Sequence, residues 1–483
     1  MGSNIDDRAR WRSRLLTLGA IAVLTMAAII SSVVYMKFLR EPPATHFESD
    51  EDHFLFGSTG IEREHGIPYW IWLVLPRVFP EHLPRPGGYA ALGMVSRQGN
   101  EMPAGFSRTT IGYPRVGVNC ALCHTARWRE RPTSPPMIVP AGPAHQTDAQ
   151  AYRRFLIACA ADDRFNAATI LGEIARNYRL SLLDRVLYRF FIIPSTRRRL
   201  LALDLKQWMH ARTEWGQGRA DVVNDAKFWL LRRPIDNSIG TADNVPLWNL
   251  QQRDGKGLFW DGSNPSLKES VVFSALAMGI TPGWLYDVEA SLTRVRDYIA
   301  AVRPPAYPFP VDQASAQHGR AVFDTACAGC HAPGGGRIGA VIRSAELGTD
   351  RHRLDAWSAE DVRNLNAIGT GRDWKFSAFR ESDGYVAVPL DGIWLRGPFL
   401  HNGSVPSLAD LLEPPERRPR QFWRGYDVYD PVKVGFVSSG VEAERLGTLH
   451  DVSRPGNGNG GHVFGTALPA EDKRALLEFL KTQ

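Results

Sequence analysis

Hydrophobic and polar positions divide the chain into an N-terminal apolar stretch and a long mixed remainder. Residues 15–36 contain no charged side chain, and about 20 consecutive apolar residues in a helix are enough to cross a bilayer. Basic residues precede the stretch, at Arg8, Arg10, Arg12 and Arg14. Basic residues stay on the cytoplasmic side, and no clear cleavage site follows. The pattern therefore predicts an uncleaved membrane anchor with the remainder of the chain outside the cytoplasm.

Two segments of opposite character follow this anchor. Residues 41–65 are acidic and polar and include two consecutive prolines, which predicts a tether between membrane and body. Residues 66–86 are aromatic and punctuated by proline. Their apolar run is too short to span a membrane, so it indicates a core or interface segment; a surface resting on the membrane is the alternative interpretation.

Helical periodicity marks the middle of the chain. A helical insertion is predicted at about residues 147–215, with Thr147 or Asp148 as its N-cap. Residues 291–302 have the pattern of another helix. The stiff segment RPPAYPFP at residues 303–310 follows it and marks the predicted domain boundary.

Two more helices are predicted near the end of the chain. Residues 314–326 have helical character, and residues 471–481 carry an apolar stripe after Pro469. We therefore expect a mainly α protein in three parts. These are a cytoplasmic tail and transmembrane anchor (1–40), an N-terminal domain with the helical insertion (41–302), and a C-terminal domain (303–483).

The pentapeptide C-x-x-C-H occurs twice in the chain. Two cysteines three residues apart can each add to one vinyl group of a porphyrin, and the adjacent histidine then becomes the proximal iron ligand. A zinc site or a disulfide is the alternative for such a motif. The motifs predict two covalently attached c-type haems, held by Cys120, Cys123 and His124 and by Cys327, Cys330 and His331.

Composition narrows the function further. The chain has 57 basic and 51 acidic residues, and neither this balance nor any motif indicates nucleic-acid binding. The fifth cysteine, Cys159, lies in an apolar helical run and is expected to be a buried, inert thiol, so no structural disulfide is predicted. The insertion is rich in arginine, which indicates either a solvated face or docking to anionic lipid or an acidic redox partner.

A repeated segment follows each motif. The segment FWDGSNPSL at 259–267 aligns with LHNGSVPSL at 400–408, so the chain is a tandem duplication with an extra helical insertion in its first half. In each copy the Asp-Gly or Asn-Gly pair is typical of a tight turn, and the following Ser can open a helix.

These segments resemble the bacterial dihaem cytochrome c peroxidase superfamily (MauG-like). The tail, with PFLHNGSVPSL, YDPVKVGF and GNGNGGHVFGT, is most similar to the dihaem rubber-oxygenase-like branch. The resemblance implies two cytochrome c-type haem domains in tandem, with a reactive haem on His124 and an electron-relay haem on His331. It also implies that Trp260 lies between the haems, and it allows calcium between the domains.

The sixth ligand of the second haem is narrowed by the distribution of methionine. No Met occurs after residue 278, so a His/Met haem ligated within the C-terminal domain is excluded. His352, His401, His450, His462 or a Tyr remain as candidates. The resemblance associates His401 with the haem propionates and favours His462, in its glycine-rich segment, as the ligand. Ligation by two histidines lowers the potential relative to His/Met.

The distal side of the first haem leaves two interpretations open. His145 caps the iron or acts as an acid/base, or it is a helix-start histidine without iron contact. The glutamate of the peroxidases aligns near Ile280, where this chain has no acid. That difference favours dioxygen binding in an apolar pocket or pure electron transfer. Phe259 is a candidate lining residue of such a pocket, together with Trp248 and Phe273.

Two functions follow as expectations. The first is a membrane-anchored dihaem c-type oxidoreductase in the inner membrane, facing the periplasm, that activates dioxygen or a peroxide at the N-terminal haem. Its catalytic candidates are Trp260, His145 and Phe259. The second is a dihaem electron-transfer subunit of a membrane complex with no substrate of its own. A redox partner protein is expected in both cases.

Overall fold

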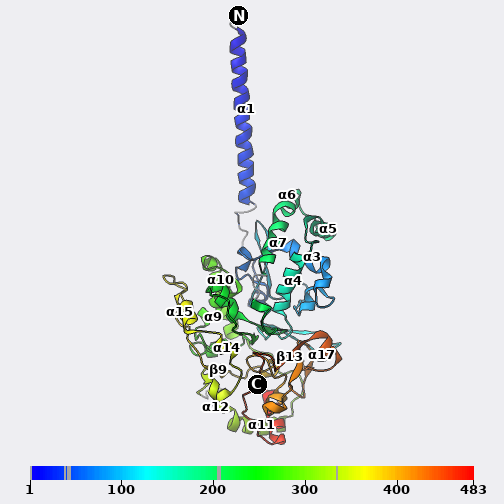
Figure 1. The fold of residues 1–483 in the computed structure, drawn as a ribbon, viewed down its shortest axis with the longest axis vertical. Helices are drawn as coiled ribbons and strands as arrows, with labels where there is room; N and C mark the ends of the chain where they lie inside the picture. The colour runs from blue at the N-terminus through cyan, green and yellow to red at the C-terminus, as the bar shows by residue number, and fades with distance from the viewer. Residues whose placement is uncertain (1–2, 37–39, 41–44, 204–207, 333–335) are drawn as a thin grey trace.

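The computed structural model describes residues 3–36, 40, 45–203, 208–332 and 336–483, and within them the chain is mainly helical. Helix α1 (Ser3–Val34) stands clear of the body in Figure 1. Its segment Trp11–Val34 is long and apolar enough to cross a membrane. At 1.5 Å per residue its 24 residues extend about 36 Å, against a hydrocarbon thickness of about 30 Å.

The predicted tether is wrong beyond residue 49, because the chain there forms part of the body. Helix α2 (Asp50–Phe56) begins at Ser49, whose side chain accepts a hydrogen bond from the Asp52 N–H. Phe54 and Leu55 are fully buried, so this helix contributes to the core. A polar composition at the helix start concealed the apolar pair behind it. Residues 41–44 lie outside the described part.

The aromatic segment after it forms α3 (Tyr69–Val78), and its burial confirms a core segment. Trp72 stacks on Tyr89 with ring centres 4.3 Å apart and donates its indole N–H to the Tyr152 hydroxyl. These contacts join α3 to the helical insertion. The buried thiol of Cys159 lies in the same hydrophobic cluster, as predicted.

The insertion begins where predicted and is divided into several helical pieces. Asp148 is the N-cap of its first helix and accepts the Ala151 N–H. The pieces are α4 (Ala149–Ala161), α5 (Ala167–Asn177), α6 (Leu182–Leu187), the π-helical turn η6 (Tyr188–Ile192) and α7 (Ile193–Ala202). Asn166 is the N-cap of α5 and Ser181 is the N-cap of α6. A capping residue in the sequence therefore marks the start of each of these helices.

Small antiparallel sheets connect the helices. The largest described sheet has the order β1-β3-β2 and leads directly into the first C-x-x-C-H motif. The strands are β1 (Ile67–Pro68), β2 (Phe106–Ile111), β3 (Tyr113–Val118), β4 (Thr125–Trp128), β5 (Met137–Pro140), β6 (Arg219–Ala220), β7 (Ala242–Asp243), β8 (Val341–Arg343), β9 (Gly384–Val386), β10 (Gln421–Arg424), β11 (Tyr429–Asp430), β12 (Gly435–Phe436) and β13 (Thr448–Asp451).

The remaining helices surround the two motifs. They are α8 (Val222–Asp225), η8 (Ala226–Leu230), α9 (Leu267–Met278), α10 (Leu285–Ala301), α11 (Gln313–Ala326), α12 (Ala328–His331), α13 (Ser344–Leu347), α14 (His352–Asp355), α15 (Ala359–Ala367), α16 (Leu408–Leu411), α17 (Val441–Leu446) and α18 (Ala470–Leu480). Helix α10 starts six residues earlier than predicted. A 3-10 turn at Pro282–Trp284 precedes it and runs into its first turn.

Helices α11 and α18 pack against each other at very short range, and both were predicted. Phe323 contacts Phe479 with ring centres 5.0 Å apart, and Leu476 and Leu480 are buried between the helices. A methyl group at Gly319 would overlap the Ala475 carbonyl oxygen. Glycine is therefore required at this crossing. The same hydrophobic cluster extends into the first half of the chain, across the predicted boundary.

We expect the substitution Gly319→Ala to destabilise the protein by about 1–3 kcal/mol, because the added methyl group separates α11 from α18. The free energy of unfolding, measured by chemical denaturation, checks this. Gly172 in α5 is the matched control, since no atom lies within 4 Å of its added methyl group. There the change to Ala is expected to be neutral or to stabilise by up to about 1 kcal/mol. Equal effects at both positions would contradict the close crossing.

Candidate functional site

Each C-x-x-C-H motif forms one tight helical turn. In the first, the N–H groups of Cys123 and His124 both donate to the Cys120 carbonyl, at 3.3 and 3.1 Å. In the second, those of Cys330 and His331 both donate to the Cys327 carbonyl, at 3.1 and 3.0 Å. The first turn (η5, Cys120–Leu122) is capped by Asn119, and the second continues from the end of α11.

The histidine of each motif is oriented by the same hydrogen bond. Nδ1 of His124 donates to the Val245 carbonyl at 2.7 Å, and Nδ1 of His331 donates to the Val388 carbonyl at 2.8 Å. A proline follows each valine. Because a carbonyl only accepts, this bond places the proton on Nδ1 and leaves Nε2 as a free ligand atom.

A cavity of about 390 Å³ lies beside the second motif, within the range of roughly 300–1,000 Å³ that is typical of ligand sites. Cys327, Cys330 and His331 line it, and so does His462 from the C-terminal segment. Most of its other lining residues are apolar. The cavity therefore brings two thiols and the imidazoles of His331 and His462 together among mainly apolar side chains.

The two imidazoles are spaced as they would be around a metal ion. The ring centres of His331 and His462 are 6.3 Å apart, with an angle of 46° between the rings. A ring bound through nitrogen at about 2.0–2.1 Å has its centre roughly 3 Å from the metal. Two such rings on opposite sides give about twice that separation. The donor set thus fits one iron between two histidines.

A buried arginine fixes the glycine-rich segment that carries His462. The Arg418 guanidinium donates to the carbonyls of Asn459, Gly461 and His462. The His462 N–H also donates to the Leu347 carbonyl at 2.7 Å. The glycine-rich segment around His462 is therefore held in place by hydrogen bonds to its carbonyl groups. Sequence reasoning missed Arg418, since nothing local marks it as a partner of residues more than forty positions away.

Two further arginines give the cavity buried positive charge. Arg253 donates to the carbonyls of Gly257 and Phe259, and Arg396 donates to those of Pro389 and Asp391. Burial lowers the pKa of each guanidinium to about 10. Among the described residues, neither forms a hydrogen bond to a carboxylate, and Nε of Arg396 has no partner. Such donors suit an anionic ligand such as a haem propionate.

The repeated segments have the same local structure. Leu258 bridges Asn264 in the first copy, and Phe399 bridges Val405 in the second. The residue after each bridge has a left-handed backbone, with φ of 57° at Phe259 and 68° at Leu400. Ser266 and Ser407 then cap the helices that follow, α9 and α16. The duplication seen in the sequence is thus present in the fold of these loops.

Trp260 connects the two backbone segments that orient the histidines. Its indole N–H donates to the Asp243 carbonyl at 2.8 Å, and its own carbonyl accepts the Val386 N–H at 2.9 Å. Asp243 lies two residues before Val245, and Val386 lies two residues before Val388. One tryptophan therefore joins both proximal segments, and it also lines the cavity.

His401 occupies the position of Trp260 in the second copy and also lines the cavity. Its ring stacks on Tyr385 with centres 3.9 Å apart and 15° between the planes. Burial, together with Arg353 and His352, holds the pKa of His401 well below its usual value, so the ring is neutral at pH 7. A neutral buried imidazole can still donate one hydrogen bond to an anion.

Two buried arginines tie together distant segments between the motifs. Arg424 pairs with Asp243 and donates to the carbonyls of Gln217 and Gly403. Arg219 donates to the Trp215 and Glu214 carbonyls and to the Asn457 side chain. Burial lowers the pKa of Arg219 to about 9. The end of the insertion, the second repeat loop and the C-terminal tail therefore meet at one charged centre.

His145 lies near the first motif but faces a different partner. The Ala144 N–H donates to the Cys123 carbonyl at 3.1 Å, while the His145 ring stacks on Phe436 with centres 3.6 Å apart. Neither ring nitrogen has a hydrogen-bond partner among the described residues. Burial lowers the pKa of His145 to about 3, so the ring is neutral at pH 7. Both interpretations of His145 stay predictions.

The three aromatic residues expected beside the first haem have the following surroundings. Trp248 and Phe259 line the cavity of the second motif. Phe273 instead contacts Phe259 and Phe379, with ring centres 5.7 and 5.1 Å away. Ile280, where the family has its acid, is a buried core residue. All four residues belong to, or pack against, one hydrophobic cluster that contains residues of both halves of the chain.

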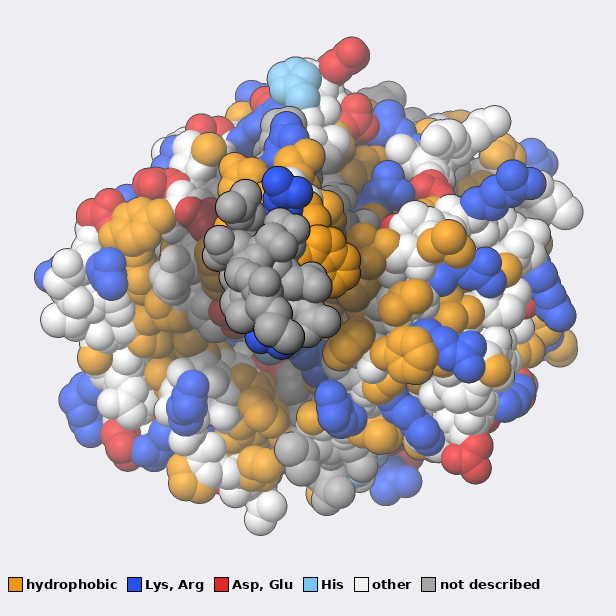
Figure 2. Space-filling model, turned by 90° about the horizontal axis from the view of Figure 1, so that it is seen from above, with side chains coloured by type: hydrophobic (Ala, Val, Ile, Leu, Met, Phe, Trp, Pro, Cys, Tyr) orange, Lys and Arg blue, Asp and Glu red, His pale blue; other side chains and the backbone are white. Residues whose placement is uncertain are grey.

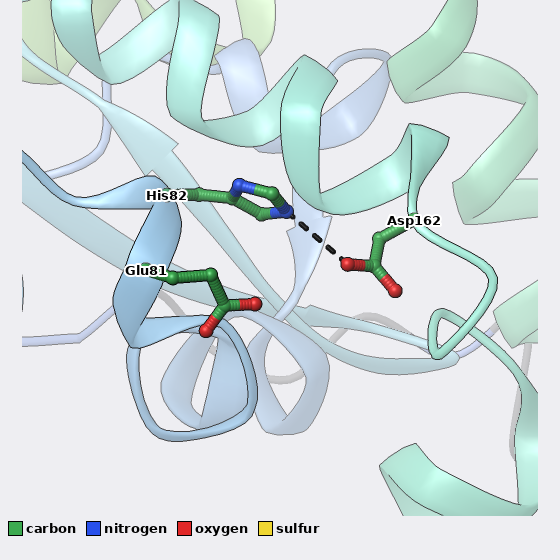
Figure 3. A group of neighbouring side chains, drawn as sticks. All are labelled: Glu81, His82 and Asp162. Carbon is green, nitrogen blue, oxygen red and sulfur yellow. Dashed lines mark hydrogen bonds and ion pairs between the residues drawn. The ribbon is translucent and has the colours of Figure 1, made fainter.

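A separate group on the insertion has metal-ligand residue types. Glu81, His82 and Asp162 bring their ligand atoms close together at the end of α4, as Figure 3 shows. The His82 ring lies 3.3 Å from the Asp162 carboxylate, and Arg164 pairs with both Glu81 and Asp162. These carboxylates already have a cation, so we interpret the group as an ion-pair network that holds the 3-10 turn Pro80–His82 against the insertion.

The two C-x-x-C-H turns, and the cavity that His331 and His462 line, are features of the class of c-type haem proteins. Comparison with known proteins agrees with this class. A family model described as RoxA-like, cytochrome c-like matches residues 384–424. That segment contains Tyr385, Val388, Arg396 and His401. The match supports a relationship to RoxA-type dihaem cytochromes and indicates a redox protein with c-type haem.

Two relatives come from Sinorhizobium fredii. The uncharacterized protein y4iJ is 28% identical over 470 residues, which cover 76% of this chain and 76% of the relative. The uncharacterized protein y4iM is 32% identical over 288 residues, which cover 50% of this chain and 65% of the relative. The likeness to y4iJ thus extends far beyond the segment that the family model matches.

We expect two covalent haems per chain, and expect one after replacing Cys327 and Cys330 by Ala, because each attached ring uses one pair of thiols. The haem-to-protein ratio that survives acid–acetone extraction, read from the pyridine complex, checks this. The variant Cys159→Ala is the control and should keep both haems, since this thiol is buried in α4 away from either motif. A single haem in the unmodified chain would contradict the prediction.

Proposed function

We propose that this chain is a membrane-anchored dihaem c-type oxidoreductase. In this proposal α1 spans the inner membrane and the body faces the periplasm. The haem on His124 is the site where dioxygen or a peroxide is activated, and the haem on His331 relays electrons from a redox partner protein. The spacing of 6.3 Å between His331 and His462 is the observation that carries the division of roles.

That spacing supports a closed second site. When bound, c-type haem supplies reversible one-electron chemistry at its iron. If both His331 and His462 held the iron, a small oxidant would find no open ligand position there. Arg418 holds the His462 segment in place, so this closure is built into the fold. A site closed on both sides is suited to electron storage and transfer, and low potential is expected from two histidines.

The connection between the sites supports electron exchange. Trp260 is hydrogen-bonded to both proximal segments, at Asp243 and at Val386. The carbonyls of Val245 and Val388 increase the electron donation of the two histidines and fix their ring planes. Contact of Trp260 with both segments supports an electron path between the two proximal histidines.

One observation favours the alternative, a dihaem electron-transfer subunit without a substrate. Proton transfer during cleavage of an O–O bond needs an acid/base group. Ile280 replaces the family's acid, and the ring of His145 is stacked on Phe436. Addition of cyanide to the oxidised protein separates the functions. A high-spin ferric signal that shifts on binding supports catalysis, and two low-spin haems in every redox state would support the alternative.

We expect the substitution His462→Gly to convert about half of the ferric haem from low spin to high spin, because one of two irons loses its second imidazole. Low-temperature electron paramagnetic resonance measures this. His352→Gln is the matched control, since the His352 ring is exposed and pairs with Asp350. An unchanged spectrum in the His462 variant would remove this residue as a ligand.

We expect Trp260→Leu to slow electron exchange between the haems by roughly tenfold or more, equivalent to about 1.4 kcal/mol on the barrier. The variant removes both the ring and the N–H that bonds Asp243. Flash reduction followed by absorbance of the half-reduced protein gives the rate. Trp248→Phe is the control, because Trp248 lines the same cavity but bonds the Pro140 carbonyl instead. Equal rates in both variants would show that Trp260 is a packing residue.

A further inference from the structure

The helical insertion presents a group of large apolar side chains to the outside. They belong to α6 and the adjoining η6, and α6 has no buried residue. Between 44% and 80% of each side chain is exposed. We call this group the α6–η6 surface, and it consists of Leu182, Leu183, Val186, Phe190 and Phe191. A solvent-facing helix is normally polar, so a contiguous apolar face of this kind marks an interaction site.

This surface lies at the end of the body that faces the membrane anchor. In Figure 1, α6 stands at the top of the body, on the side toward α1, whereas α11 and α12 lie at the opposite end. Figure 2 views the molecule along α1, and on this face Lys and Arg side chains surround patches of hydrophobic side chains. A bilayer crossed by α1 would therefore lie next to the α6–η6 surface.

The charge around the surface matches an anionic partner. Residues 176–199 contain seven arginines and one acidic residue. Arg189 lies over the Phe190 ring, with the guanidinium carbon 5.8 Å from the ring centre. Arg179 and Arg185 have no acidic partner among the described residues. Aromatic and aliphatic side chains among arginines are typical of segments that lie in a membrane interface.

We propose that the α6–η6 surface inserts into the interface of the bilayer that α1 spans, and that the surrounding arginines bind anionic phospholipid headgroups. This inference rests on the proposed membrane anchoring. A single weak interfacial contact would be transient, but α1 keeps the surface at high local concentration beside the bilayer. Docking would hold the body in one orientation, with the cavity of the second motif turned toward soluble partners.

The test uses the complete haem-loaded chain with a protease recognition sequence inserted after Arg40. The protein is reconstituted into vesicles of phosphatidylcholine with or without one quarter phosphatidylglycerol, cut with the protease, and separated by flotation. We expect the released body to stay with the anionic vesicles and to leave the neutral ones. Raising the salt concentration should weaken retention, because the arginine contribution is screened.

Variants assign the binding to this surface. On anionic vesicles we expect the double substitution Phe190→Ser and Phe191→Ser to lower the retained fraction at least tenfold. The double substitution Arg179→Glu and Arg185→Glu should have the same effect there. The double substitution Val432→Ser and Val441→Ser is the matched control. Both valines are also strongly exposed, at 79% and 78%, and they lie outside the insertion. Haem content and the unfolding temperature show that each variant is folded.

The test distinguishes failure of the docking inference from failure of the proposed membrane anchoring. If the uncut chain does not float with vesicles, α1 is not an anchor and the proposed localisation is wrong. If the uncut chain floats but the cut body leaves anionic vesicles, the docking inference is overturned and the anchor stands. Retention that the phenylalanine variant does not change also overturns it. The docking inference is also overturned if the α6–η6 surface binds an acidic redox protein and does not bind vesicles.

Discussion

The arrangement of both sites depends on one kind of hydrogen bond, from a motif histidine to the carbonyl of a valine that precedes proline. His124 reaches Val245, and His331 reaches Val388. The proline after each valine has no N–H and restricts the valine to extended backbone, so the carbonyl has a fixed direction. The bond fixes each ring and leaves its Nε2 as the free ligand atom. The spacing between the His331 and His462 rings depends on this orientation.

Local signals were enough to predict much of the fold. The capping residue Asp148, the helices α11 and α18 and the buried thiol of Cys159 are each encoded in fewer than fifteen consecutive residues. The duplication was visible because the repeated loop depends on a left-handed residue and a capping serine, which leave a trace in the sequence. The two C-x-x-C-H motifs predicted the position of the site because each motif is also a short local pattern.

Contacts between distant residues were not predictable from these patterns. The Val245 carbonyl lies 121 residues from His124, and the Arg418 clamp on the His462 segment spans more than forty residues. Helix α2 looked like a tether because its first turn is acidic, although acidic residues at a helix start are favourable. The sequence also did not show that Phe259, a candidate lining residue of the first haem pocket, lines the cavity beside the second motif.

The two halves share their loops and differ in what completes each site. In the second half His462, on a segment held by Arg418, lines the cavity together with His331. The first half instead carries the helical insertion, whose end returns through Arg219 and Arg424 to the charged centre between the motifs. Removing Arg424 would leave the buried Asp243 carboxylate without its cation, which typically costs about 3–5 kcal/mol. The same insertion carries the exposed α6–η6 surface. The two halves therefore share their repeated loops, whereas the His462 segment belongs only to the second half and the insertion only to the first.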